Sequence, residues 1–429
     1  MENTNLTVGT RAALVSVVTR GRTDKEVNAS LEELRRLLET AGGEAVFTMI
    51  QNKEAPDVRT YLGSGKVAEL CYYCATGDVS LVVFDCELSP SQIRNLETAL
   101  GDVRVIDRSM LILDIFALHA VSGEGKLQVE LAQLKYTAPR LIGKGDMLSR
   151  LGGGIGTRGP GESQLETDRR HLQRRIRALE ESLEEMAAGR RTMRAARDRS
   201  GLAKVAIVGY TNAGKSTLLN YLTNAGILAK DQLFATLDPT TRKCSLPGGE
   251  TVLLTDTVGF IRNLPHHLIH AFRSTLDEAV YADLLVIVID ASDPEAAAQL
   301  TVTEELLESL GAGGKPTLYV FNKCDLGVAT PGLVRGGGEC VYISAATGQG
   351  VELLLSRIEQ MLHEGKRRVT FCFPNARQGL VNRLYENATV HEVEYGADGV
   401  TVTATVDAKT YGPLAQYDLS PVKEDTDEY

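Results

Sequence analysis

Nine residues near the middle of the chain have the residue types and the spacing needed to bind a polyphosphate. Their pattern, Gly-x-x-x-x-Gly-Lys-Ser, lies between an apolar run at 205–208 and a helical pattern at 218–222, which is the setting of a phosphate-binding P-loop. Glycines leave backbone N–H groups open to phosphates, and the following helix directs its positive end at them. We expect Lys215 to supply a cation and Ser216 to ligate Mg²⁺. The nine residues are Gly209, Tyr210, Thr211, Asn212, Ala213, Gly214, Lys215, Ser216 and Thr217.

A second group of chemically capable residues follows the apolar run at 252–254. It consists of Asp256, Thr257, Val258 and Gly259, an Asp-x-x-Gly pattern. The Asp256 carboxylate can reach Mg²⁺ through a water, and the Gly259 N–H can bond the terminal phosphate of a nucleoside triphosphate. That bond exists only while the terminal phosphate does, so it reports the state of the nucleotide. We expect Lys215 and Gly259 to be the catalytic groups.

The base is indicated by a third pattern, Asn-Lys-x-Asp, at the end of the apolar run at 318–321. Guanine presents two adjacent N–H donors that the Asp325 carboxylate can accept, whereas adenine would leave this carboxylate unsatisfied. After a last strand pattern comes a loop whose backbone can hold the base from the other side. The residues of the pattern and the loop are Asn322, Lys323, Cys324, Asp325, Ser344, Ala345 and Ala346. The predicted substrate is GTP and the product is GDP.

A candidate first switch, defined as residues 234–242, lies between the first two patterns. A threonine in this segment should reach Mg²⁺ and the γ-phosphate when GTP is bound. Spacing alone does not decide among Thr236, Thr240 and Thr241. The residues of the first switch that we expect near the nucleotide are Phe234, Ala235, Thr236, Leu237 and Asp238.

The residue after Gly259 is Phe260, where many GTPases carry a glutamine that positions the attacking water. A phenyl ring cannot orient water by hydrogen bonding. We therefore expect slow intrinsic hydrolysis that is accelerated when a partner orders the site or contributes groups to it.

The overall composition is that of an ordinary globular protein, with 43% hydrophobic and 24% charged residues among 429. A net charge of −10 excludes binding of polyanions through total charge, so nucleic-acid contact requires a local basic patch. Seven cysteines, an odd number, fit reduced thiols. Since we find neither a signal-peptide pattern nor an apolar run long enough for a bilayer, we expect a cytoplasmic protein.

The elements that must position these residues alternate between strand and helix patterns, which predicts an α/β fold. Residues 1–110 carry four strand patterns separated by helix patterns, as expected for a small α/β domain with parallel strands. Residues 201–365 predict a P-loop GTPase domain with a mixed, mostly parallel sheet. Residues 366–429 predict a small α+β domain of three strands and a short helix, ending in an acidic tail.

Residues 111–200 are expected to form an α-helical hairpin around a glycine-rich tip at 151–161. Pro139 is expected to end the first helix. The second helix carries apolar residues that step by sevens, fours and threes, a heptad seam that requires a partner helix. These residues are Leu165, Leu172, Ile176, Leu179, Leu183 and Met186.

The second helix of this hairpin is also rich in arginine, including Arg169, Arg170 and Arg174. The arginines can form the solvated face of a coiled coil, which the intervening glutamates at 180–185 favour. They can equally form a basic prong that contacts RNA phosphates, which the excess of Arg over Lys favours. The residues alone leave both interpretations open.

Four of these stretches together resemble the HflX family of translation-factor-related GTPases, and the resemblance covers nearly all of the chain. They are segment 152–162, the P-loop 209–216, the first switch 234–242 and segment 256–260. The resemblance implies an N-terminal α/β domain, a helical hairpin and a GTPase domain. It also implies that Ser216 and Thr236 ligate Mg²⁺, and it favours RNA contact by the hairpin.

The resemblance further implies binding to the large (50S) ribosomal subunit near its catalytic RNA, with roles in splitting or rescuing stalled ribosomes under stress or in subunit maturation. Ala346 departs from the lysine that GTPases commonly carry after Ser-Ala, which predicts somewhat weaker nucleotide binding with the guanine specificity of Asp325 unchanged. We expect a monomer. The alternative is a GTP-gated switch that binds a protein partner without ribosome action; an ATP-using enzyme is disfavoured by Asp325.

Overall fold

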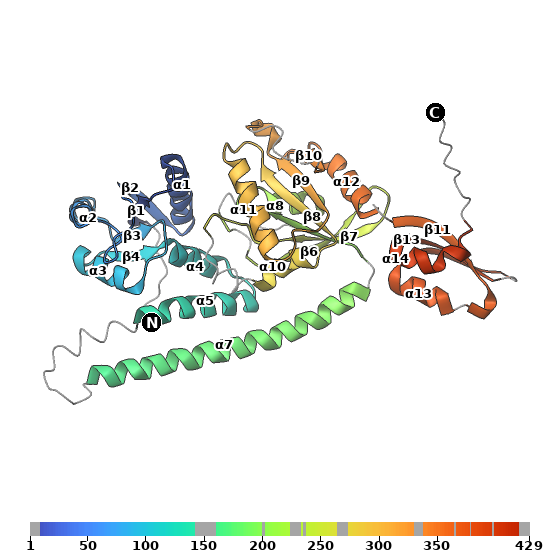
Figure 1. The fold of residues 1–429 in the computed structure, drawn as a ribbon, viewed down its shortest axis with the longest axis horizontal. Helices are drawn as coiled ribbons and strands as arrows, with labels where there is room; N and C mark the ends of the chain where they lie inside the picture. The colour runs from blue at the N-terminus through green and yellow to red at the C-terminus, as the bar shows by residue number, and fades with distance from the viewer. Residues whose placement is uncertain are drawn as a thin grey trace.

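The protein is described by a computed structural model, in which three β-sheets and a long helical hairpin are arranged side by side (Figure 1). Ala235 and Thr236 of the first switch, the glycine-rich tip up to residue 159 and the acidic tail lie outside the described residues. The structure describes residues 9–141, 160–199, 202–223, 233–234, 237–263, 273–329, 338–363, 366–377, 379–396 and 399–419.

The first sheet contains the four strands expected in the N-terminal part of the chain. All its pairs are parallel, in the order β2-β1-β3-β4. β1 is a central strand with a run of buried residues, which explains its continuous apolar sequence. The strands are β1 (Thr10–Val18), β2 (Gly43–Asn52), β3 (Leu81–Phe84) and β4 (Arg104–Asp107), and the helices are α1 (Asp24–Thr40), α2 (Ser64–Thr76) and α3 (Pro90–Leu100).

Helix α4 (Arg108–His119) lies between the first and the second sheet. Every residue from Arg108 to Phe116 is buried. One continuous apolar cluster combines α4, one face of the first sheet and residues of the second sheet's unit, including Phe260 and Leu285. The two units therefore share a core. The division into domains at residues 110, 200 and 365 stays a prediction, and α4 runs across the first of these boundaries.

The second sheet has the order β10-β9-β8-β5-β7-β6, in which every pair is parallel except β6 with β7. Because the carboxyl ends of parallel strands meet at one edge, the motifs that follow β5, β7 and β9 are brought together. The strands are β5 (Lys204–Gly209), β6 (Thr240–Ser245), β7 (Thr251–Asp256), β8 (Leu284–Asp290), β9 (Thr317–Asn322) and β10 (Cys340–Tyr342). The helices are α8 (Lys215–Thr223), α10 (Arg273–Val280), α11 (Ala296–Ser309) and α12 (Val351–His363). This α/β sheet, mixed and mostly parallel, is the one expected around the P-loop.

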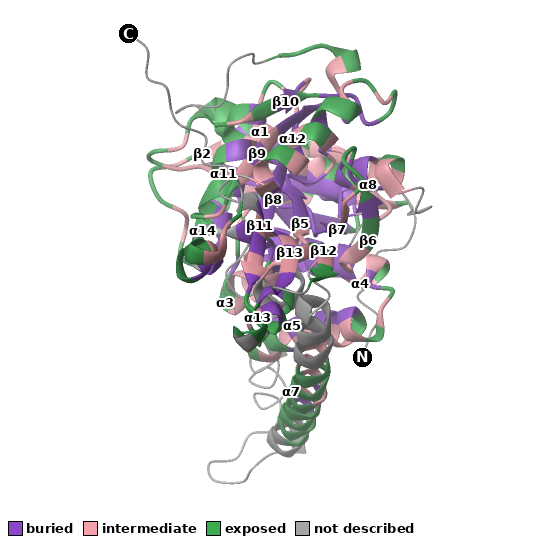
Figure 2. Cartoon of the chain, turned by 90° about the vertical axis from the view of Figure 1, so that its right-hand side faces the viewer, coloured by how far each residue is buried: buried purple, intermediate pink, exposed green. Residues whose placement is uncertain are grey.

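The hairpin consists of α5 (Gly123–Leu141) and α7 (Pro160–Arg199), which lie against each other as expected. Leu134 of α5 packs with Leu172 and Leu179 of α7, so part of the heptad seam is buried. Most side chains of α7 whose burial is described, between residues 167 and 190, are exposed (Figure 2). The prediction that Pro139 ends the first helix is wrong, because α5 continues to Leu141. Pro139 removes one i→i−4 backbone hydrogen bond, and the helix nevertheless continues past it for two described residues.

The third sheet is antiparallel, in the order β11-β13-β12, and confirms the three strands expected in the last part of the chain. Figure 1 shows it on the opposite side of the second sheet from the first. Its elements are β11 (Lys366–Phe373), α13 (Gly379–Asn387), β12 (Thr389–Tyr395), β13 (Val400–Asp407) and α14 (Ala408–Tyr411). None of the helices in the described part of the chain is long and apolar enough to cross a membrane.

Candidate functional site

The P-loop connects β5 to α8, and its two outer glycines are required by close packing. Gly209 has φ +144°, and a Cβ there would lie 2.2 Å from the Val288 carbonyl oxygen. Gly214 has φ +93°, and a Cβ there would lie 2.2 Å from Nδ2 of Asn322. The loop is therefore wedged between β8 and the end of β9, with its backbone shaped as a phosphate-binding turn.

Lys215 and Ser216 stand at the start of α8, where the predicted phosphate and metal contacts begin. The Lys215 side chain is buried and Nζ donates to the Tyr210 carbonyl oxygen at 2.8 Å. Burial lowers the pKa of Lys215 to about 8, against the opposing charge of Asp256. The Ser216 hydroxyl donates to Asp256 Oδ2 at 2.6 Å, so the two predicted metal-side groups are adjacent across β5 and β7.

Gly259 lies directly against the P-loop. A Cβ at this position would approach Thr211 Cα to 2.9 Å and Lys215 Nζ to 3.0 Å. The backbone around it is joined to the P-loop, because the Thr211 N–H donates to the Phe260 carbonyl at 2.8 Å and the Phe260 N–H donates to the Gly209 carbonyl at 3.1 Å. The structure thus brings together the two residues expected to be catalytic, Lys215 and Gly259.

Thr257 and Val258 turn inward rather than toward the P-loop surface. The Thr257 hydroxyl donates to the Ile207 carbonyl at 2.9 Å, and Val258 is buried in the apolar cluster around α4. Phe260 is 1% exposed and belongs to the same cluster. The phenyl ring at this position is a packing group, in keeping with the expectation that it does not position water.

The Asn-Lys-x-Asp segment follows β9 and is attached to the P-loop by Asn322. Asn322 Nδ2 donates to the Ala213 carbonyl at 2.8 Å, and Asn322 Oδ1 accepts from the Ala345 N–H at 2.9 Å. This side chain joins three of the predicted segments, a role that the sequence reasoning did not assign to it. Lys323 has φ +64° and pairs with Asp290 at 2.7 Å.

The two remaining parts of the expected base site lie beside this segment. The Cys324 N–H donates to the Ile343 carbonyl at 3.1 Å, which ties the segment to the loop of Ser344, Ala345 and Ala346. Asp325 and Ala346 are exposed, whereas Ser344 and Ala345 are buried. An exposed carboxylate at the rim, with buried backbone beneath it, is the arrangement expected for recognition of a base edge.

The first switch contacts α4 and α5 rather than the P-loop through the residues that are described. Phe234 packs edge-on against Phe116 of α4, with ring centroids 4.7 Å apart. Leu237 is buried, and Asp238 accepts hydrogen bonds from Val121 and Ser122. Thr241 lies in β6, and its hydroxyl is 2.9 Å from that of Thr255.

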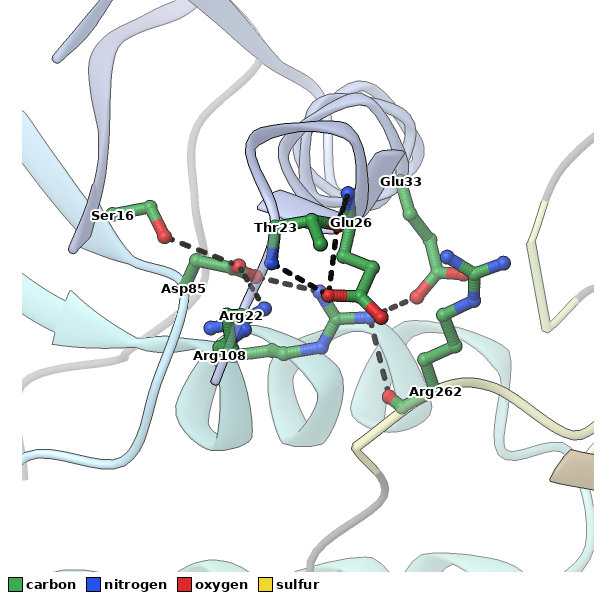
Figure 3. Close-up of polar contacts among 8 residues, drawn as sticks. All are labelled: Ser16, Arg22, Thr23, Glu26, Glu33, Asp85, Arg108 and Arg262. Carbon is green, nitrogen blue, oxygen red and sulfur yellow. Dashed lines mark hydrogen bonds and ion pairs between the residues drawn. The ribbon is translucent and has the colours of Figure 1, made fainter. Parts of the chain in front are cut away.

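Sequence reasoning missed a buried ionic cluster that joins the first sheet's unit to Arg262, in the segment after Gly259 (Figure 3). The Arg108 guanidinium pairs with Asp85 at 2.9 Å and with Glu33 of α1, and it also donates to the Arg262 carbonyl at 3.3 Å. Arg108 is 2% exposed. Arg108 stands among mostly apolar residues between Val105 and Phe116, and a charged side chain in such a run was the signal that could have revealed the cluster.

The same cluster reaches the P-loop through Tyr210. The Tyr210 hydroxyl donates to Glu33 and accepts from the Arg262 N–H at 2.8 Å. Arg262 pairs in turn with Glu295 at 2.9 Å. Burial raises the pKa of Glu33, although Arg108 and Tyr210 act in the opposite direction. The first sheet is therefore bonded both to the P-loop and to the segment after Gly259.

Three family models match consecutive parts of the chain. A model described as GTP-binding GTPase N-terminal matches residues 28–117, and one described as GTP-binding GTPase middle region matches residues 119–197. A model described as 50S ribosome-binding GTPase matches residues 204–323. The last match contains the P-loop, the Asp-x-x-Gly segment and the first half of the base-recognition segment.

Curated relatives match over nearly the full length. GTPase HflX of Lacrimispora saccharolytica is 49% identical over 94% of this chain and 95% of its own length. GTPase HflX of Caldanaerobacter subterraneus subsp. tengcongensis is 48% identical over 96% of this chain and 94% of its own length. A crystal structure of a GTP-binding protein from Sulfolobus solfataricus in complex with GDP is 26% identical, with a TM-score of 0.43, over 82% of this chain and 99% of that one.

The two HflX matches extend over 94% and 96% of this chain, far beyond the segments that meet at the edge of the second sheet. The length and identity of the matches exclude a similarity restricted to the P-loop alone. The chain belongs to the HflX family of GTPases, and it is a GTPase whose GTPase domain is of the 50S ribosome-binding kind.

Proposed function

We propose that this GTPase acts on the large ribosomal subunit, either splitting or rescuing stalled ribosomes under stress or maturing subunits. The observation that supports this most directly is the match of residues 204–323 to a 50S ribosome-binding GTPase model, on a sheet edge that gathers the P-loop, the Asp-x-x-Gly segment and the Asn-Lys-x-Asp segment. The HflX relatives named above support the same assignment. We further propose that the protein works as a monomer in the cytoplasm.

At the nucleotide, we propose that P-loop N–H groups and Lys215 hold the phosphates, Gly259 senses the γ-phosphate and Asp325 selects guanine. The residues at the metal side fit Mg²⁺, because the Ser216 hydroxyl and the Asp256 carboxylate are hard oxygen groups 2.6 Å apart. Ser216 and Thr236 are the proposed ligands. The contact of Thr241 in β6 with Thr255 in β7 supports Thr236 over Thr241. Bound Mg²⁺ would neutralise charge on the β- and γ-phosphates.

Phe260 supports a dependence of hydrolysis on the partner. Its ring is packed in the core shared with α4, so this chain offers no side chain at that position to orient the attacking water. We expect the ribosome to supply or order the missing group. The measurement is the GTPase rate with and without purified 50S subunits, at low and at moderate salt. Strong, salt-sensitive stimulation is expected; absence of both stimulation and co-sedimentation would contradict the proposal.

The hairpin is the proposed RNA contact, through exposed arginines on α7 such as Arg169, Arg174 and Arg177. Arginines present fork-like donors that suit phosphates, and contacts of this kind weaken with salt. Replacing Arg169, Arg170 and Arg174 with Glu should abolish 50S binding and leave basal hydrolysis intact. A matched control replaces the same number of arginines in the first-sheet unit, namely Arg20, Arg59 and Arg94. If both triple variants lose binding equally, the hairpin is not the specific anchor.

The ion pairs within the hairpin favour a second candidate, a GTP-gated switch for a protein partner in which the hairpin is only a scaffold. Arg175 forms a two-point pair with Glu130, and Lys135 pairs with Glu180 at 2.7 Å. In both pairs a basic side chain is occupied by a glutamate of the hairpin instead of a phosphate. The same 50S assay separates the candidates, because a switch for a protein partner predicts neither stimulation by 50S subunits nor co-sedimentation with them.

The action on ribosomes can be resolved further with intact ribosomes. Splitting predicts that the protein with GTP converts 70S particles to subunits, as measured by light scattering. Subunit maturation predicts binding to free 50S subunits with no effect on 70S particles. The comparison of GTP with a non-hydrolysable analogue shows whether hydrolysis drives the action or only releases the protein.

A further inference from the structure

The carboxylate of Asp238 connects the first switch to the start of the hairpin. Asp238 Oδ2 accepts from the Ser122 N–H at 2.7 Å and from the Val121 N–H at 3.1 Å, and the Ser122 hydroxyl also donates to Asp238. We propose that Asp238 is a coupling residue, through which the nucleotide bound at the P-loop controls the position of the α5–α7 hairpin. The proposal rests on the assignment of residues 234–242 as the first switch.

The contact forms part of the N-terminal cap of α5. The Ser122 hydroxyl accepts from the Gly125 N–H at 2.8 Å while it donates to Asp238, so one hydroxyl joins the switch carboxylate to the first turn of the helix. A negative charge at this end of a helix is favourable, and hydrogen bonds to a carboxylate are stronger than neutral ones. The first turn of α5 therefore depends on a residue more than a hundred positions away in the sequence.

Gly125 shows that the Asp238 carboxylate packs closely against the first turn of α5. A Cβ on Gly125 would lie 2.6 Å from Asp238 Oδ1 and 3.0 Å from the Ser122 hydroxyl. Gly125 carries no positive φ and lies inside a helix, where alanine would otherwise be the better residue. The absence of a side chain at this position is explained by the approach of Asp238.

The series of contacts that begins at Asp238 continues from α5 to α7. Glu124, in the same first turn, pairs with Arg190 of α7 and accepts from Gln128 at 3.0 Å. Farther along, the leucine seam and the Arg175–Glu130 pair hold the two helices together. Coupling between distant sites is carried by contiguous packed and hydrogen-bonded elements of this kind. A shift of Asp238 is thus passed to both helices of the hairpin.

Asp238 would be moved by Thr236, the proposed Mg²⁺ ligand, which is only two positions earlier in the chain. On the other side of Thr236, Phe234 is held against Phe116 of α4. Both described flanks of the first switch are therefore attached to the α4–α5 region. Drawing Thr236 toward Mg²⁺ and the γ-phosphate acts against these attachments, so GTP should weaken the contact of Asp238 with α5. By thermodynamic reciprocity, holding the hairpin in place should alter the relative affinity for GTP and GDP.

Hydrogen exchange of the full-length protein tests the proposal without ribosomes. The readout is the peptide covering residues 119–126, compared with GDP and with guanylyl imidodiphosphate, both with Mg²⁺. The amides of Val121 and Ser122 should exchange about tenfold faster with the triphosphate analogue, because each loses a charge-assisted hydrogen bond. Equal or slower exchange with the analogue would overturn the proposal.

Two variants break the contact from opposite sides. Asp238→Ala removes the carboxylate, whereas Gly125→Ala displaces it and leaves Asp238 in the first switch. Both should give fast exchange at residues 119–126 in either nucleotide, with the difference lost. If only Asp238→Ala does so, the residue acts at the nucleotide and the coupling is refuted.

Ser89→Ala is the matched control, because Ser89 caps α3 through the Gln92 N–H and touches no part of the second sheet's unit among its described contacts. This variant should retain the nucleotide difference at residues 119–126. Its loss would assign the effect to general destabilisation and overturn the proposal. These readouts stand apart from 50S stimulation, so failure of the ribosome proposal and failure of the coupling give different results.

Discussion

Two regions of the molecule use ion pairs in opposite ways. At the joint between the first sheet and the P-loop, Arg108 and Asp85 are 2% and 0% exposed. In the hairpin, Arg175 and Glu130 are 53% and 40% exposed. Buried pairs are costly to break because the remaining charge is left without water, whereas exposed pairs contribute little. Breaking the ion pairs of the joint around α4 should therefore cost much more free energy than breaking those of the hairpin. We expect the joint to keep one geometry and the hairpin to change its geometry more easily.

The largest expected effect is at the joint. Arg108→Met removes the nearest cation from the buried carboxylates of Asp85 and Glu33, and should lower the free energy of unfolding by about 3–5 kcal/mol. Urea denaturation followed by circular dichroism measures it. A control is Arg104→Met, whose contact with Asp114 is long, at 3.9 Å, and partly exposed. An equal decrease in the free energy of unfolding of the two variants would show that the buried ion pair of Arg108 contributes no more to stability than the partly exposed one of Arg104.

A somewhat smaller effect is expected in the hairpin seam. Leu179 is 2% exposed, and Leu179→Ala should weaken the packing of α7 on α5 by about 2–3 kcal/mol. The loss should be confined to the hairpin, as seen by faster hydrogen exchange in α5 and α7 with β1 and β5 unchanged. Faster exchange throughout the molecule would mean that the hairpin is part of the central cooperative unit.

The contribution of Glu33 to the free energy of unfolding should depend modestly on pH, in the direction opposite to that of a carboxylate whose pKa is lowered by folding. Burial raises the pKa of Glu33, so the folded protein binds this proton more tightly than the unfolded chain. The resulting stabilisation is present below the ordinary value of 4.5 and is lost as pH rises through the higher folded value. As pH rises above 4.5, the wild type should lose stability relative to Glu33→Gln until Glu33 is ionised in the folded protein. A constant difference between the two proteins would exclude this effect.

The smallest effect is expected for the exposed pair of the hairpin. A double-mutant cycle with Glu130→Gln and Arg175→Gln should give a weak coupling that disappears at about 1 M salt, where the screening length is about 3 Å. A coupling that persists at high salt would mean that this pair is structurally similar to the buried one, and the comparison of the two regions would fail.

The sequence predicted the edge of the second sheet better than the joint, for a physical reason. The P-loop, Asp256 and Asn322 follow strands, and parallel pairing alone brings strand ends to one edge. The contacts of Glu33 with Tyr210, and of Asp238 with Ser122, join residues more than a hundred positions apart without any shared periodicity. Such pairs are set by how whole units dock. No local pattern in the chain encodes them.

The hairpin was predicted from its leucine spacing, and Leu172 and Leu179 confirmed it. Met186 was also placed in the seam, yet it is 38% exposed, although Arg190, one turn farther along α7, pairs with Glu124 of α5. A heptad pattern shows that a partner helix exists and does not fix how deeply each of its residues is buried. The burial of Phe260 was likewise not predicted, because its neighbour in the core, α4, had been assigned only a helical pattern.

Helix α7 has 40 residues and ends at Arg199, only a few positions before β5 begins at Lys204. At 1.5 Å per residue the helix is about 60 Å long. One end of this helix is thus close to β5, the strand that leads into the P-loop, and the other end is about 60 Å away. A rotation of α7 by about 5° about its β5 end would move the distant end by roughly 5 Å, the pitch of one helical turn.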